Sequence, residues 1–246
     1  MKERLIYGFH AIRARLRAAP GSIKEVWVDE GRSDARMRDL LALMSGAGLA
    51  VRTADGSRLD RMVGGARHQG VVAKVEPVAM ARTLDEVMQG IEGAPLVVVL
   101  DGVTDPHNLG AVLRSADAFG AHAVIAPKDK AVGLNATVEK VACGAAETVP
   151  YLMVTNLARC LDELKERRVW TVAADAGADK TIAQIDAKGG IAWVLGAEGA
   201  GLRQLTRKTC DEAARIPIGG TVESLNVSVS AAICLYESAR QRGGIP

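Results

Sequence analysis

The chain has 246 residues, of which 48% are hydrophobic, and its 31 basic and 29 acidic residues give a net charge of +2. This composition excludes a disordered chain, and the length is enough for one or two domains with buried cores. Aromatic residues make up only 3% of the chain, which argues against a surface that stacks nucleic-acid bases on several aromatic rings.

The N-terminal residues 1–77 form a basic segment, with 14 Lys and Arg against 9 Asp and Glu, whereas the rest of the chain has 17 against 20. A basic module beside a mildly acidic one suggests binding to a polyanion, and an ordinary solvated surface is the alternative. Short periodic segments predict a compact α/β unit here. Its expected elements are helices over 8–18, through 37–44 after a cap at Ser33 or Asp34, and over 57–63, and strands over 25–28, 49–53 and 70–75.

Residues 78–94 are expected to link this unit to the rest of the chain, with a short helix over 84–91. Residues 95–246 then alternate more regularly between apolar strands and helices. Unbroken apolar strands between helices predict a mostly parallel sheet covered on both faces. The expected strands are 96–100, 123–126, 148–152, 170–174, 192–195 and 214–218, and a helix over 227–240 closes the chain.

Three loops at strand ends carry polar residues, and ligands of parallel sheets bind beyond the carboxyl ends of the strands. The first, within LDGVTDPHNLGAVLRSAD (100–117), places Asn108 where a helix cap belongs and Arg114 six residues further on. Six residues turn a helix by about 240° net, so the two side chains share a site only if Arg114 reaches back or the helix begins after Asn108. The alternatives are a helix cap for Asn108 and a surface ion pair for Arg114.

The second loop, in AWVLGAEGAGL (192–202), places Glu198 among glycines that let a ligand approach the backbone. The order of these glycines is not the dinucleotide-binding fingerprint. The third loop leads from a strand through Ser224 and Asn226 into a helix rich in small residues. A solvated carboxylate for Glu198 and helix capping for the other two are the alternative interpretations.

Targeting and metal-binding patterns are absent from the sequence. The longest apolar run, 95–100, is too short to span a membrane, and no apolar segment follows the charged start, so neither a membrane helix nor a signal peptide is expected. The sequence therefore predicts a cytoplasmic protein. No metal is expected, because the four cysteines lack metal-ligand spacing and are interpreted as reduced, buried thiols.

Together the three loop motifs resemble the signature of the SpoU (TrmH) branch of the SPOUT RNA methyltransferases, over about residues 95–246. The resemblance implies an α/β fold with a C-terminal trefoil knot, S-adenosylmethionine as cofactor, methyl transfer to a ribose 2′-hydroxyl, and a homodimer. The stretches IYGFHAI (6–12) and ARHQGVVA (66–73) resemble the L30e-like substrate-binding domain of many such enzymes. With both domains present, the resemblance implies that the substrate is the 2′-hydroxyl of a guanosine in large-subunit (23S) rRNA.

The resemblance also assigns roles to individual residues. Glu198 is expected to position Arg114 near a dimer interface through charge-assisted hydrogen bonds. A guanidinium normally stays protonated, so either Arg114 fixes a substrate phosphate that accepts the hydroxyl proton, or the site makes Arg114 itself release one. The motif residues expected in catalysis are Asn108, Arg114, Glu198, Ser224 and Asn226, and backbone groups of Gly196, Ile216, Ile218 and Leu225 are expected to hold the cofactor.

The basic N-terminal module is expected to supply the contacts to RNA phosphates. The candidate contacts are Arg13, Arg15, Arg17, Lys24, Arg67 and His68. For His68 a structural role is the alternative. Three other functions stay open: methylation of a tRNA or another rRNA ribose, a non-catalytic RNA-binding or ribosome-assembly factor, and an unrelated nucleotide-binding enzyme.

Overall fold

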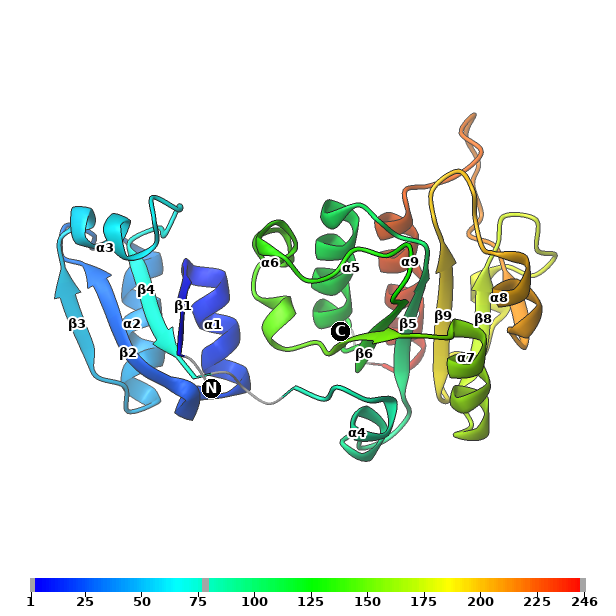
Figure 1. Ribbon diagram of the computed structural model, residues 1–246, viewed down its shortest axis with the longest axis horizontal. Helices are drawn as coiled ribbons and strands as arrows, with labels where there is room; N and C mark the ends of the chain where they lie inside the picture. Colours follow the sequence, from blue (N-terminus) through cyan, green and yellow to red (C-terminus); the bar gives the residue numbers. More distant parts are fainter. Residues whose placement is uncertain (1–2, 77–79, 244–246) are drawn as a thin grey trace. The chain divides into compact units, whose positions relative to one another are not determined.

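The computed structural model describes residues 3–76 and 80–243, and it divides into two compact units, each with its own β-sheet (Figure 1). The first unit comprises the chain up to residue 80 together with Cys143–Thr148, and the second comprises the remainder. The expected end of the N-terminal domain and the start of the linker fall on residues 77–79, which lie outside the described residues.

The first unit is built on a four-stranded sheet in the order β1-β4-β2-β3, in which β4 is antiparallel to both neighbours and β2 and β3 are parallel. Helices α1 and α2 pack apolar residues on one face, and α3 covers Trp27 on the other. The predicted cap of α2 is confirmed, because the Asp34 side chain accepts from the Met37 N–H at 3.1 Å. The elements are β1 (Arg4–Tyr7), α1 (Phe9–Ala18), η1 (Pro20–Ser22), β2 (Ile23–Asp29), α2 (Ala35–Gly46), β3 (Val51–Ala54), α3 (Gly56–Met62) and β4 (Val71–Val75).

The second unit is a six-stranded parallel sheet in the order β10-β8-β9-β5-β6-β7, which confirms the predicted α/β class. Its strands are β5 (Leu96–Asp101), β6 (Ala123–Pro127), β7 (Tyr151–Val154), β8 (Trp170–Ala174), β9 (Ile191–Gly196) and β10 (Glu212–Ala214). Its helices are α4 (Leu84–Gln89), α5 (Pro106–Ala118), α6 (Ala136–Ala142), α7 (Leu157–Glu166), η3 (Ile182–Gln184), α8 (Gln204–Thr209) and α9 (Val227–Gln241); the turn η2 (Ala145–Glu147) groups with the first unit.

Helices cover both faces of this sheet (Figure 1). Helices α4 and α7 pack on the face formed by alternate residues of β5, β6 and β9, whereas α5 and α9 lie on the other. Every residue of β5 is buried, as the unbroken apolar strand predicted. In the part of the chain that the structure describes, no helix has the length and apolarity needed to cross a membrane.

Two predicted strands were misplaced, and a proline explains each. The strand expected over 214–218 ends at Ala214, so Ile216 and Ile218 lie in a loop. Pro217 has no N–H to continue the ladder. The strand expected over 148–152 begins only at Tyr151, after η2 and Pro150.

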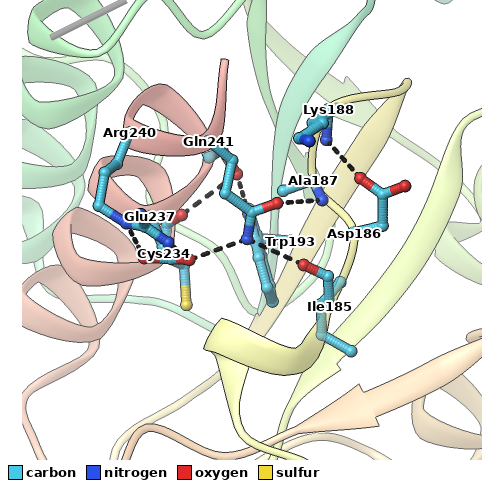
Figure 2. A network of polar contacts seen from close by, with 10 residues as sticks. Ile185, Asp186, Ala187, Lys188, Trp193, Cys234, Glu237, Arg240 and Gln241 are labelled. Atoms are coloured by element: carbon cyan, nitrogen blue, oxygen red, sulfur yellow. Dashed lines mark hydrogen bonds and ion pairs between the residues drawn. The ribbon is translucent and has the colours of Figure 1, made fainter. Parts of the chain in front are cut away.

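The C-terminal helix is tied to β9 and to the loop that precedes β9 by side-chain hydrogen bonds (Figure 2). The Gln241 amide donates to the Ile185 carbonyl and accepts from the Ala187 N–H, both at 2.9 Å. The indole N–H of the buried Trp193 donates to the Ser238 hydroxyl at 2.8 Å. These bonds fix α9, which begins beside the site described below.

Arg242 continues this attachment, and its replacement by alanine is expected to lower the free energy of unfolding by about 2 kcal/mol. Its guanidinium donates to the carbonyls of Ala94, Pro95 and Ala187 at 2.9, 3.0 and 2.9 Å, and burial lowers its pKa. Urea unfolding followed by circular dichroism measures the loss. The control is Arg159→Ala, which removes only an exposed pair with Glu163 and is expected to cost less than about 0.5 kcal/mol. Equal losses in the two variants contradict the prediction.

Candidate active site

A cavity of about 610 Å³ opens where β8 and β9 end. Ligands of parallel sheets bind at this edge, and the volume is in the range of small-molecule sites. The loops after β8, β9 and β10 form its wall. The residues lining it include all four expected cofactor contacts, Gly196, Ile216, Ile218 and Leu225, together with Glu198, Ser224 and Asn226.

The loop after β9 folds back tightly, and Gly196 permits this. A Cβ atom on Gly196 would lie 2.1 Å from the carbonyl carbon of Gly201, an overlap with backbone atoms that no side-chain movement relieves. The Gly201 N–H donates to the Ala197 carbonyl at 2.9 Å, and Gly201 has a φ of 65°, which favours glycine. The cavity wall here is therefore a closed backbone turn.

The three sequence motifs meet at one hydrogen-bonded cluster of Asn108, Glu198 and Asn226. The Asn108 amide donates to Glu198 Oε1 at 3.0 Å, and the Asn226 amide donates both to the same oxygen and to Asn108 Oδ1, the latter at 2.9 Å. The cluster thus connects the start of α5, the loop after β9 and the start of α9. Ser224 lies near it in the cavity wall.

The placement of Asn108 at a helix cap is wrong. Asp105 caps α5 by accepting from the His107 N–H at 3.0 Å, and Pro106 is the first helical residue. Proline at this position has no N–H to satisfy and a φ suited to the helix, so the helix begins there. Asn108 is consequently within the first turn, only 9% exposed, and its side chain is free to join the cluster.

Asn226 has two roles at once. Its Oδ1 accepts from the Ser228 N–H at 2.9 Å and caps α9, as the capping interpretation predicted. Its amide nitrogen meanwhile binds Glu198 and Asn108. Helix capping and membership of the cluster are therefore not alternatives.

Arg114 lies apart from this cluster within one chain. It is exposed on α5, does not line the cavity, and has no hydrogen bond or ion pair among the described residues. Glu198 binds Asn108 and Asn226 instead. The expected contact between Glu198 and Arg114 is thus not made within a single chain.

Sequence reasoning missed a buried carboxylate that anchors the loop after β9 at both ends. Asp101 pairs in register with Gly196, where the loop begins. Its carboxylate accepts from the Arg203 backbone N–H at 3.1 Å and from Arg203 Nε at 2.6 Å, where the loop ends. The available signal was an acidic residue directly after an unbroken apolar strand, and Asp175 after β8 shows the same pattern.

Of the basic residues expected to contact RNA, two form no ion pair with any described residue, and the others each lie beside a carboxylate. Arg17 and Arg67 are exposed. Lys24 is exposed but pairs with Glu76 at 3.0 Å, and Arg13 is half-buried with its guanidinium 3.9 Å from Asp39.

Arg15 is wrong as a phosphate contact. It is 1% exposed and pairs with Glu147 inside the first unit, so its guanidinium does not face solvent. The structural alternative for His68 is supported, because its Nδ1 accepts from the Gly70 N–H at 3.0 Å and its Nε2 lies 3.1 Å from Asp60.

The chain combines a parallel α/β unit, which has a cavity built from loops, with a small basic α/β unit. Comparison with known sequences identifies the class of protein that has this combination. The SpoU rRNA methylase family matches residues 95–236, and the family described as RNA 2′-O ribose methyltransferase substrate binding matches residues 5–81. The chain belongs to the SpoU rRNA methylase family.

Individual relatives resemble nearly the whole chain. The 23S rRNA (guanosine-2′-O-)-methyltransferase RlmB of Bordetella pertussis is 60% identical over 98% of both chains, and RlmB of Ralstonia nicotianae is 56% identical over 100% of this chain and 98% of its own. The crystal structure of the SpoU methyltransferase AviRb from Streptomyces viridochromogenes in complex with AdoMet is also similar. It has a TM-score of 0.72 and 26% identity, and the match covers 99% of this chain and 92% of that one.

Proposed function

We propose that this protein transfers the methyl group of S-adenosylmethionine to the 2′-hydroxyl of a guanosine in 23S rRNA. The observation that carries the proposal is the identity of 60% over 98% of both chains with an RlmB enzyme. The meeting of Asn108, Glu198 and Asn226 at the cavity supports it, since a protein that only binds RNA has no need of that arrangement. Such a substrate places the protein in the cytoplasm.

The residues of the cavity fit the proposed cofactor. Leu195, Ile216, Ile218 and Leu225 supply apolar surface for a nucleoside, and the loops supply backbone groups for hydrogen bonds. The bound cofactor supplies an electrophilic methyl group on a sulfonium. The cluster of Asn108, Glu198 and Asn226 holds the start of α5, the loop after β9 and the start of α9 together, which preorganises this side of the cavity for the reaction.

Arg114 is proposed to act on the RNA. A guanidinium stays protonated, so its role is to fix a substrate phosphate that accepts the proton of the hydroxyl. Its exposure and its lack of a partner among the described residues suit that role.

We also propose a homodimer in which Arg114 reaches the site of the second copy. Helix α9 exposes Val229 and Tyr236, each 46% accessible, and Tyr236 packs its ring edge-on against Phe119 at the end of α5. An apolar strip on the same two helices that carry Asn226 and Arg114 suits a second copy as its partner.

Arg17 and Arg67 are proposed to neutralise RNA phosphates. The double variant Arg17→Ala/Arg67→Ala is expected to flatten the dependence of log affinity on log salt concentration by about 1.5, because each lost phosphate contact removes about 0.7–0.9 from the slope. Fluorescence anisotropy with a labelled 23S rRNA fragment at several salt concentrations measures it. Arg159→Ala is the control and is expected to leave the slope unchanged; an unchanged slope in the double variant contradicts the assignment.

The direct test is a methyl-transfer assay with labelled S-adenosylmethionine and unmodified total RNA, followed by digestion and identification of the labelled nucleoside. Labelled 2′-O-methylguanosine in large-subunit rRNA is the expected result. Label in small RNAs instead would show that the substrate is tRNA and not 23S rRNA. Absence of both label and cofactor binding points instead to a non-catalytic RNA-binding protein.

A further inference from the structure

The cavity wall contains three charged side chains among the described residues: Asp175, Glu198 and Arg207. Glu198 is already bound to Asn108 and Asn226. Within the described part of the chain, Arg207 is therefore the one cation that lines the cavity, and Asp175 is the remaining anion. Arg207 comes from α8 and Asp175 follows β8, so the two enclose the cavity from different elements.

Asp175 holds the Arg207 side chain by one edge only. Arg207 Nε donates to Asp175 Oδ2 at 2.8 Å, and Asp175 Oδ1 accepts from the Gly177 N–H at 2.9 Å. The hydrogen bond from Arg207 lowers the pKa of the Asp175 carboxyl, so this group stays ionised at neutral pH. The two terminal nitrogens of Arg207 have no hydrogen bond among the described residues, so they remain available to bind a carboxylate with two parallel hydrogen bonds.

We propose that Arg207 binds the α-carboxylate of the amino-acid part of S-adenosylmethionine and that Asp175 is the positioning residue that orients its guanidinium. The inference rests on the proposed function. S-adenosylmethionine carries a single anionic group, and the described residues of the cavity wall present a single cation. A planar guanidinium fixed at Nε matches a carboxylate with two parallel hydrogen bonds, which also gives the cofactor a defined orientation.

Isothermal titration calorimetry with two ligands tests this contact. The ligands are S-adenosylmethionine and its decarboxylated form, which lacks only the carboxylate. The wild type is expected to bind S-adenosylmethionine about tenfold more tightly, and Arg207→Met to abolish this preference by weakening that ligand alone. Arg207→Lys is expected to keep part of the preference, because lysine keeps the positive charge but lacks the paired N–H donors of the guanidinium.

The matched control is Lys208→Met. Lys208 is the neighbouring cation on α8 and does not line the cavity, so this variant is expected to leave both affinities unchanged. Equal weakening of both ligands by Arg207→Met overturns the inference, since a structural role does not distinguish them. A wild type without the preference also overturns it. If the wild type binds neither ligand, the proposed cofactor fails, and the inference fails with it.

Discussion

Arg114→Ala is expected to lower kcat for methyl transfer by at least about 100-fold while changing the Kd of S-adenosylmethionine by less than about twofold. The reason is that Arg114 is exposed on α5 and lies outside the cavity wall, so its loss leaves the cofactor cavity intact. Single-turnover methylation of rRNA measures the first quantity, and calorimetry measures the second. Arg159→Ala, an exposed helical arginine elsewhere in the same unit, is the control.

If the Arg114→Ala variant retained more than a few per cent of the wild-type kcat, Arg114 would have no essential role in methyl transfer. A large loss of cofactor affinity would mean that the variant damages the cavity rather than the chemistry. Both outcomes are distinguishable from the expected one in the same two measurements.

Complementation decides whether Arg114 acts within its own chain or in a second copy. Arg114→Ala and Glu198→Ala are each expected to be inactive alone. If Arg114 serves the partner's site, a heterodimer purified through two different tags contains one complete site and recovers about half of the wild-type activity. If Arg114 serves its own chain, neither site is complete and the heterodimer stays inactive. The contacts of Glu198 with Asn108 and Asn226, in place of Arg114, favour the first outcome.

Gly196→Ala is expected to weaken binding of S-adenosylmethionine by about 5- to 150-fold, since overpacking by one methyl group costs about 1–3 kcal/mol and here displaces a cavity wall. The added carbon would lie 2.1 Å from the backbone of Gly201. The loop that carries Glu198 must therefore move away from β9. Calorimetry measures the affinity, and the melting temperature shows whether the unit still folds.

Gly219→Ala is the matched control for this variant. Gly219 follows β10 on the loop between Ile218 and Ser224, and apart from its chain neighbours no described residue would have a heavy atom within 4 Å of an added Cβ there. Its affinity is expected to stay within about twofold of the wild type, as open surface positions tolerate small changes. If Gly196→Ala folds and binds the cofactor as well as Gly219→Ala does, the loop after β9 does not form the cofactor site.

The sequence by itself determined the class of fold and the segments that carry the site. Unbroken apolar strands such as 96–100 are a local signal, because burial on both faces leaves no polar position. The polar loops that follow were identifiable for the same reason, since they stand at the ends of such strands. The cap at Asp34 was also predictable, because capping depends on residues three apart in the chain.

Only the tertiary structure decided which side chains meet. Asn108 binds Glu198 across 90 residues and Asn226 across 118, and Asp101 anchors Arg203 across 102, separations that no local pattern encodes. The burial of Arg15 against Glu147 likewise depends on packing and contradicted an expectation based on charge alone. Periodicity reports which face of an element is buried, whereas a polar contact depends on where the loops of different strands converge in space.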